Sequence, residues 1–217
     1  EIYDQRLIGQ VFEIESRVQG ANGIPGDWRH LKCYGGGMIL DWGVHLLDQL
    51  LMMVKSKIVS VYSNTSMVLG DDVDDGFQSI INFENGVKAL IEVGTTNFIQ
   101  LPRWYVKGTD GSAVIENWQL EGHLVVRNEG VEIKAPSPIK AGQGLTKTMA
   151  PEESTSVLRL PQAQKMDQSF YYNLVSVIEG TAEPIVKNDE VLRVMHLIEM
   201  IFESARTNEV IKGFDLY

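Results

Sequence analysis

The segment from Phe77 to Val93 constrains the fold of this 217-residue chain more than any other, because apolar and polar residues alternate through it. A period of two is typical of strands with one buried face. Asn85-Gly86 interrupts the alternation and favours a tight type I′ turn, in which both central residues have positive φ. One face would carry Phe77, Ser79, Ile81 and Phe83 before the turn, and Val87, Ala89, Ile91 and Val93 after it. The segment therefore predicts an antiparallel hairpin.

Other turn signals predict that this hairpin belongs to a larger meander. Asp110-Gly111 and Asn128-Glu129-Gly130 each separate two short apolar runs, so each favours a further hairpin. These hairpins would pair residues 104–107 with 113–116 and residues 124–127 with 131–134. Strands are also expected over residues 8–18 and 58–65. In the first of these, one face would carry Phe12, Ile14 and Val18, and the other, facing water, would carry Glu13, Glu15 and Arg17.

Two apolar stripes with a helical period lie near the end of the chain. Asp167 would cap the first helix and Gly180 would end it, while Asn188 or Asp189 would cap the second. The first stripe consists of Phe170, Leu174, Val177 and Ile178, and the second of Val191, Val194, Met195, Ile198, Ile201 and Phe202. Residues 135–165 are rich in Pro, Gly, Ser and Thr, so an irregular connection is expected there.

This order of elements predicts the fold class. Consecutive hairpins followed by helices favour an α+β domain, with helices packed on one face of a large, open, mostly antiparallel sheet. No internal repeat or linker divides residues 1–217, so one domain is expected. No strand–Gly-x-Gly-x-x-Gly–helix unit occurs, so no Rossmann domain is expected within these residues.

Charge and composition exclude several classes of protein. The chain has 19 Lys and Arg against 29 Asp and Glu, a formal net charge of −10. An acidic surface repels phosphate backbones and anionic lipids, so neither nucleic-acid nor membrane binding is expected. The most apolar stretch, residues 38–54, carries charges that argue against a membrane span, and the polar run 1–6 argues against a signal peptide. Cys33 has no internal partner, which favours a reducing compartment such as the cytoplasm.

One expected helix, over residues 38–54, carries chemically useful side chains. It follows Gly35-Gly36-Gly37 and contains Asp41, His45 and Asp48 at spacings of four and three residues, which places them on one stripe. A carboxylate one turn from an imidazole can hydrogen-bond it and fix its tautomer, so His45 with Asp41 is a candidate acid/base pair. Gly43 costs about 1 kcal/mol of helix stability relative to Ala, which indicates close approach by a strand or a flat ligand.

Structural interpretations compete with this one. A single Asp or His on a helix is more often solvated or hydrogen-bonded within the fold, and for Asp48 that interpretation is as good as a functional one. The three side chains could also ligate a metal, but their spacing fits no zinc motif and no metal site is predicted. The acidic turn 71–76 lacks the ligand pattern of a calcium loop and is expected to cap the entry of a strand.

Gly35-Gly36-Gly37, followed by Asp41, Gly43, His45 and Asp48, resembles the signature of the glucose-fructose oxidoreductase / inositol dehydrogenase / MocA family of NAD(P)-dependent oxidoreductases. The motif there is three glycines, a few apolar residues and then Asp-x-Gly-x-His-x-x-Asp. Three other segments, 8–11, 82–86 and 204–205, resemble the first strand, the central hairpin and the last helix of the family's C-terminal domain. The resemblance covers essentially this whole chain but only the C-terminal half of a family member.

The resemblance implies a fold and a role. The fold would be the dihydrodipicolinate-reductase-like C-terminal domain, and the role would be binding a sugar, polyol or related hydroxy compound. NAD or NADP would be bound mainly by an N-terminal Rossmann domain, and the lysine of a Glu-Lys-Pro segment would join the active site. Neither the Rossmann domain nor the Glu-Lys-Pro segment is present in this sequence, so the isolated chain would be inactive. The open face of the sheet would pair subunits into a homo-oligomer.

The resemblance also implies site residues. His45 would accept the proton of the substrate hydroxyl as hydride leaves for nicotinamide, and Asp41 would orient His45 and contact the substrate. The other substrate-binding residues would be Trp28, Arg29, Gly36, Gly37 and Tyr171. Two alternatives stay open. One is a stand-alone ligand-binding or assembly module, and the other is a metal-dependent hydrolase or isomerase that uses Asp41, His45 and Asp48.

Overall fold

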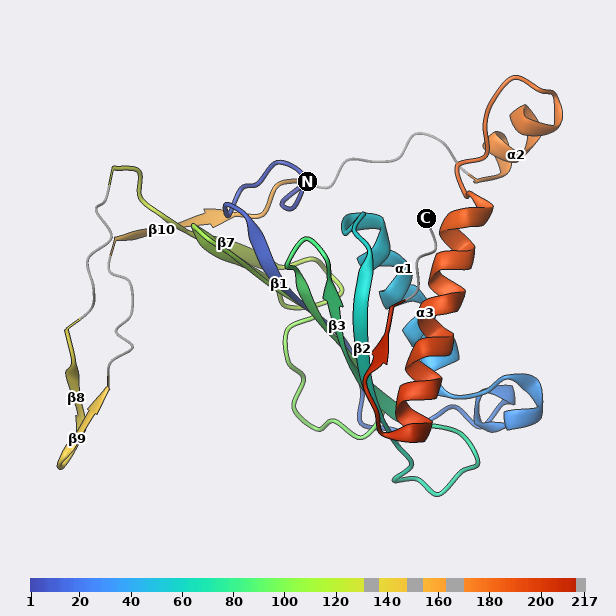
Figure 1. Ribbon diagram of the computed structural model, residues 1–217, viewed down its shortest axis with the longest axis horizontal. Helices are drawn as coiled ribbons and strands as arrows, with labels where there is room; N and C mark the ends of the chain where they lie inside the picture. Colours follow the sequence, from blue (N-terminus) through green and yellow to red (C-terminus); the bar gives the residue numbers. More distant parts are fainter. Residues whose placement is uncertain (131–136, 148–153, 163–169, 214–217) are drawn as a thin grey trace.

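The computed structural model describes residues 1–130, 137–147, 154–162 and 170–213. Within them, nine strands form one sheet in the order β10-β7-β6-β5-β1-β4-β3-β2-β11, and two strands form a separate hairpin (Figure 1). The sheet strands are β1 (Val11–Gln19), β2 (Ile58–Ser66), β3 (Gly76–Phe83), β4 (Lys88–Gly94), β5 (Trp104–Gly108), β6 (Gly111–Ile115), β7 (Gly122–Arg127), β10 (Thr155–Arg159) and β11 (Ile211–Lys212). The hairpin consists of β8 (Ile139–Gly142) and β9 (Leu145–Lys147).

The helices are fewer, and two of them, α1 and α3, cover one face of the sheet. They are α1 (Val44–Met53), α2 (Phe170–Ile178) and α3 (Asn188–Thr207), with short turns η1 (Trp28–His30), η2 (Lys32–Tyr34) and η3 (Ile39–Gly43). Helices α1 and α3 lie side by side on the same side of the sheet, hereafter the helix face, and α3 runs along β2 (Figure 1). The other side is hereafter the open face. The predicted α+β class with a large, mostly antiparallel sheet is confirmed.

The core lies between these helices and the central strands. Alternation along β3 and β4 directs one residue in two toward the helix face, where the apolar side chains are buried. The buried cluster includes Leu46, Leu47 and Leu50 of α1, Leu197 and Ile201 of α3, and Val61, Phe77, Ile81 and Ile91 of the strands. Each of these side chains is less than 3% exposed, so they anchor the two helices on the sheet.

The predicted hairpin over 77–93 is confirmed as β3 and β4, but its turn differs from the prediction. Phe83 donates its backbone N–H to the carbonyl of Val87 at 2.9 Å, and Gly86 donates to the carbonyl of Phe83 at 3.0 Å. Gly86 has φ of +86°, whereas Asn85 does not have positive φ. The connection is therefore a three-residue loop, a type I turn followed by a left-handed glycine.

The first strand of the chain lies in the middle of the sheet. β1 pairs in parallel with β4, from Glu13 beside Lys88 to Gln19 beside Gly94, and antiparallel with β5. Its register shifts between Val11 and Glu13, which leaves Val11 buried and Phe12 44% exposed. The prediction that Phe12 shares a buried face with Ile14 was therefore wrong, because a local irregularity breaks the period of two.

The side chains on the polar face of β1 are less exposed to solvent than predicted. Arg17 is only 7% exposed, because its guanidinium pairs with the carboxylates of Glu15 and Glu92. Glu15 also lies 3.4 Å from the ammonium of Lys107 on β5. Burial alone would raise the pKa of Glu15, but Arg17 and Lys107 hold it below its ordinary value. A charged network, not a row of solvated side chains, therefore occupies the centre of the open face.

The later part of the chain departs most from the predictions. The region 135–165 contains β8, β9 and β10 where an irregular connection was expected, and β10 pairs with β7. Residues 131–134 and the predicted cap Asp167 lie outside the described residues. Helix α2 is present, but Phe170, Leu174 and Ile178 of its apolar stripe are 52%, 42% and 77% exposed. None of the helices among the described residues is long and apolar enough to cross a membrane.

Candidate functional site

The helix that carries the candidate site begins with a turn held from a distance. The carboxylate oxygen Oδ2 of Asp74 accepts the backbone N–H of Ile39 at 2.9 Å, and the carbonyl of Asp74 accepts that of Met38 at 3.1 Å. These bonds satisfy N–H groups that the start of a helix leaves without partners. Burial raises the pKa of Asp74. The acidic turn 71–76 therefore serves this helix, in addition to preceding β3.

The triple glycine lets three segments pack closely. A Cβ on Gly36 would lie 2.3 Å from the carbonyl oxygen of Arg29, and one on Gly37 would lie 2.3 Å from Oδ1 of Asp74. Gly37 has φ of +107° and donates its N–H to the carbonyl of Arg29 at 2.9 Å. The glycines therefore hold the η1 loop against the helix start.

The first turn of the helix, η3, is a π-turn that ends at Gly43. A Cβ on Gly43 would lie 2.9 Å from two ring carbons of Phe77 on β3. The expected close approach to Gly43 is therefore made by a strand side chain, whose ring packs against the bare backbone. Single π-turns of this kind are frequent at functional sites.

A cavity of about 480 Å³ opens beside this turn and is hereafter the His45 pocket. The loop after β1 contributes Gly20, Gly23, Pro25 and Arg29; the helix contributes Met38, Asp41, Trp42 and His45; the ends of β1 and β4 contribute Val18, Gln19, Val93, Gly94 and Thr95. Because β1 and β4 are parallel, their carboxyl ends lie together at the pocket. The structure thus brings Arg29, Asp41 and His45, all predicted site residues, into one cavity.

Within the pocket, Asp41 pairs with Arg29 rather than with His45. Nε of Arg29 lies 3.1 Å from Oδ1 of Asp41, and Nη1 of Arg29 lies 2.6 Å from Oδ2 of Asp27. One guanidinium between two carboxylates leaves one negative charge uncompensated. The exposed imidazole of His45 makes an edge contact with Trp42, with ring centres 5.7 Å apart. Among the described residues, no hydrogen bond joins Asp41 to His45.

The remaining predicted site residues lie outside the lining of this pocket. Trp28 is 45% exposed and its ring centre lies 4.8 Å from the guanidinium carbon of Arg29. Tyr171 is 76% exposed on α2 and contacts Phe170. Asp48 lines a different cavity with Lys55 and Arg193, so the expected stripe of three side chains is divided between two cavities. No group of three or more His, Cys, Asp or Glu is arranged for a metal in the part of the chain that the structure describes.

Sequence reasoning missed two components of the site. Thr95 and the ends of β1 and β4 were not expected there, because nothing local indicates that these strands are parallel neighbours. Trp118 was also missed. It lies between β6 and β7, its ring centre is 5.3 Å from that of Trp42, and the guanidinium carbon of Arg103 stands 3.5 Å over it. Arg103, Trp118 and Trp42 therefore form a cluster that borders His45, and only the identity of the aromatic residues could have suggested it.

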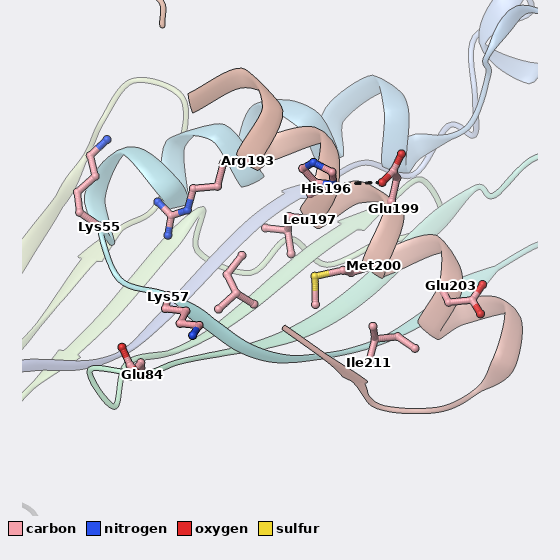
Figure 2. Close-up of a pocket in the computed structure, with 11 residues that line it drawn as sticks. Lys55, Lys57, Glu84, Arg193, His196, Leu197, Glu199, Met200, Glu203 and Ile211 are labelled. Atoms are coloured by element: carbon pink, nitrogen blue, oxygen red, sulfur yellow. Dashed lines mark ion pairs between the residues drawn. The ribbon is translucent and has the colours of Figure 1, made fainter. Parts of the chain in front are cut away.

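A larger cavity, of about 700 Å³, lies between α3 and the β2 edge of the sheet (Figure 2). Several of its charged groups have partners within the protein. Nδ1 of His196 lies 3.3 Å from Glu199, Lys55 pairs with Glu190 at 3.0 Å, and Arg193 donates to the carbonyl of Val54 at 3.2 Å. Arg193 thereby caps the end of α1, so these contacts favour a structural role for the cavity.

The chain belongs to the family described as the GFO/IDH/MocA C-terminal domain, whose profile matches residues 1–114. This confirms the resemblance seen in the triple-glycine and histidine motif. No curated protein sequence matches the chain.

Solved structures agree with this membership. An NAD-binding protein from Listeria innocua is 60% identical to the chain, with a TM-score of 0.90, and the match covers 97% of this chain and 61% of that one. An oxidoreductase from Bacillus cereus is 16% identical with a TM-score of 0.69, and the match covers 97% of this chain and 62% of that one. An aldose-aldose oxidoreductase from Caulobacter crescentus complexed with glycerol is 20% identical with a TM-score of 0.68, and the match covers 97% of this chain and 58% of that one. The last two show the fold alone. The chain spans about three fifths of the length of each.

Proposed function

We propose that the chain is the substrate-binding and catalytic C-terminal domain, residues 1–217, of an NAD(P)-dependent oxidoreductase, acting on a sugar, a polyol or a related hydroxy compound. The observation that carries the proposal is an exposed imidazole, His45, at a pocket whose other charged side chains are Asp41 and Arg29. Family membership and the NAD-binding name of the 60%-identical relative support it. The aldose-aldose oxidoreductase name of a relative supports the substrate class through the fold only.

Oxidation of an alcohol removes a hydride from carbon and a proton from oxygen as the carbonyl forms. An imidazole nitrogen of His45 takes the hydroxyl proton, which lowers the barrier to hydride departure. Oδ1 of Asp41 is held by Arg29, so its other oxygen, Oδ2, is left to accept a hydrogen bond from a neighbouring substrate hydroxyl. Trp42 fixes one side of the imidazole and limits where the substrate carbon can lie. In the reverse direction His45 returns the proton.

The described residues fit the substrate end of such a site better than the cofactor end. Gly36 packs against Arg29 and Gly37 against Asp74, and no strand–glycine loop–helix unit forms a cradle for a pyrophosphate among the described residues. When bound, NAD or NADP supplies the hydride acceptor. We therefore infer that an N-terminal Rossmann domain of the same protein binds the NAD or NADP. We also infer that these 217 residues alone do not catalyse turnover of the substrate.

The proposal extends to assembly and location. The open face of the sheet, where Arg17 is buried between carboxylates, is proposed to pair with a second copy of the chain. Two exposed apolar residues on this face, Ile80 (46%) and Val157 (70%), support this pairing. The single exposed cysteine, Cys33, supports a cytoplasmic location.

The test is a substrate screen with the full-length enzyme encoded by the gene, in which sugars and polyols are offered with NAD⁺ and with NADP⁺. His45→Asn should lower kcat by about 10²–10⁴-fold with little change in the melting temperature, because the side chain is exposed. His123→Asn, at an exposed histidine on β7, is the matched control and should leave kcat unchanged. Equal kcat in His45→Asn and wild type, or substrate-dependent NAD(P) reduction by the 217 residues alone, contradicts the proposal.

A further inference from the structure

Trp118 lies in the loop that joins β6 to β7, at the same end of the sheet as the His45 pocket. The strand register fixes this placement, because Trp104 of β5 pairs with Ser16 of β1 and with Ile115 of β6, the last residue before the loop. The loop therefore lies beside the carboxyl end of β1, whose final residues line the pocket. A side chain on this loop is placed to contact a ligand that extends out of the pocket.

The loop holds Trp118 in a strained and internally bonded turn. Leu120 has φ of +61°, which is costly for a residue with a large side chain, and its N–H donates to the carbonyl of Asn117 at 3.2 Å. Oδ1 of Asn117 accepts the N–H groups of Gln119 at 3.0 Å and of Glu121 at 3.2 Å. The same turn leaves Trp118 54% exposed. Strained turns that present a large side chain in this way are concentrated at ligand-binding sites.

Two contacts orient the ring of Trp118. The guanidinium carbon of Arg103 lies 3.5 Å from the ring centre, a cation–π contact. Nε of Arg103 is buried and has no hydrogen-bond partner in the part of the chain that the structure describes. The ring of Trp42 lies 5.3 Å away at an angle of 55°, and Trp42 itself lines the pocket. Trp118 therefore extends the aromatic surface of the pocket away from His45.

Polar groups within the pocket and aromatic rings at its edge together suit a sugar in ring form. The face of an aromatic ring is negative and attracts the polarised C–H bonds on one face of a sugar ring. Hydroxyls around the rim of the same sugar need hydrogen-bonding partners, and Gln19, Asp41 and Thr95 of the pocket offer them. An open-chain polyol has no rigid C–H face, so it gains less from stacking and loses more conformational freedom on binding.

We propose that Trp118 is a specificity-determining residue that stacks on the C–H face of a cyclic sugar bound at the His45 pocket, and that Arg103 is the positioning residue that holds its ring. This inference rests on the proposed function and deepens it. It narrows the substrate class from hydroxy compounds in general to sugars in ring form, whether free or glycosidically linked. Because Trp118 contacts the part of the sugar away from the reacting carbon, its loss should raise KM much more than it lowers kcat.

The kinetic test uses the full-length enzyme and compares ring sugars with open-chain polyols. The probes are D-glucose, D-galactose and their methyl glycosides against sorbitol and galactitol, each with NAD⁺ and with NADP⁺. Trp118→Leu should raise KM for the ring sugars by about 3–10-fold and leave KM for the polyols unchanged. Phe202→Leu, at a residue that is 39% exposed on α3 and outside the pocket lining, is the matched control and should change neither value.

Variants of Arg103 test its positioning role. Arg103→Met keeps a long apolar side chain but removes the cation, so it should raise KM for the ring sugars by less than Trp118→Leu does. Arg103→Lys keeps a cation over the ring and should restore most of the loss. Equal kinetics of Arg103→Met and wild type would contradict the role of Arg103. Melting temperatures measured for every variant exclude unfolding as the cause.

Saturation-transfer NMR gives a measurement that needs no turnover. The two methyl glycosides are offered to the full-length enzyme with NADH or NADPH, so that no sugar is oxidised. Saturation should be strongest on the C–H protons of one face of the sugar ring, and Trp118→Leu should abolish this preference. Absence of saturation for both methyl glycosides, or the same pattern in Trp118→Leu and wild type, overturns the inference. An equal rise in KM for ring sugars and polyols, or a rise only in KM for NAD⁺ and NADP⁺, overturns it as well.

This inference and the proposed function fail in different ways. Ring sugars that bind through Trp118 but are oxidised with neither cofactor contradict the proposed function and support the stacking role. Turnover of ring sugars that depends on His45 but not on Trp118 supports the proposed function and contradicts the stacking role.

Discussion

The Nε atom of Arg29 lies 3.1 Å from Oδ1 of Asp41, and this ion pair joins the loop after β1 to the π-turn that precedes α1. The two side chains are 32% and 18% exposed, so solvent screens the pair only in part. The pair decides which oxygen of Asp41 remains for a ligand.

The coupling between these two side chains can be measured. Urea denaturation of Arg29→Gln, Asp41→Asn and the double variant should give a coupling energy of about 0.5–1 kcal/mol, because the pair is partly exposed. Additive effects, to within about 0.3 kcal/mol, would show that the pair does not hold the loop in solution.

Gly43→Ala should destabilise the protein even though alanine is the better helix former. The added Cβ would lie 2.9 Å from the ring of Phe77, which is 2% exposed and cannot move aside. We expect overpacking to outweigh the gain in helix propensity, with a net loss of about 1–2 kcal/mol in unfolding free energy. Phe77→Leu in the same chain should recover part of it. A higher melting temperature for Gly43→Ala alone would be the contrary result.

Asp74 offers a comparison of two substitutions. Asp74→Ala leaves the N–H of Ile39 without its acceptor and should cost about 1–3 kcal/mol. Asp74→Asn keeps an oxygen acceptor and buries no charge, so it should cost less.

The comparison also has a pH dependence. Burial raises the pKa of Asp74 above its ordinary value of 3.8, so the folded wild type holds this proton more tightly than the unfolded chain. The contribution of the Asp74 carboxyl to the free energy of unfolding is therefore greatest below pH 3.8. It falls as the pH rises through the pKa that this carboxyl has in the folded protein. The stability of Asp74→Asn relative to wild type should therefore improve from pH 3.5 to pH 7, as measured by denaturation at both values. A constant difference would contradict the raised pKa.

Glu15 should show the opposite dependence. Burial alone would raise its pKa, but the hydrogen bonds and charges of Arg17 and Lys107 hold it below its ordinary value of 4.5. The contribution of the Glu15 carboxylate to stability is therefore fully present above pH 4.5. It is lost as the pH falls through the pKa that Glu15 has in the folded protein. Glu15→Gln should cost about 1–2 kcal/mol at pH 7 and less at pH 3, as measured by urea denaturation. Glu129→Gln, at an exposed site, should show neither effect.

Sequence periodicity was sufficient for the local parts of the fold. The alternation through 77–93 fixed β3 and β4, because each strand has one face against the helices. It could not distinguish the observed turn from the predicted one, since both place a left-handed glycine at Gly86. Nor could it place β1, because an alternating strand has the same pattern whether its neighbours are parallel or antiparallel.

The candidate site was predictable in its residue types but only partly in its geometry. The spacing of Asp41, His45 and Asp48 assumed a regular α-helix, whereas the packing of Gly43 on Phe77 accompanies a π-turn. The partner of Asp41 came from the η1 loop, through a tertiary contact that spacing does not reveal. Arg29 was nevertheless among the expected residues, because the resemblance to the family implied that the loop of Trp28 and Arg29 lines the pocket.

The central position of β1 also governs how the chain can reach its native state. β1 precedes the other strands of the sheet in the chain, yet both of its neighbours, β4 and β5, come much later, so its pairing closes long loops. At a synthesis rate of about 5–20 residues per second, its edges stay unpaired for several seconds on the ribosome. The hairpins on either side can form by local contacts, so β1 is the late strand that joins two preformed halves.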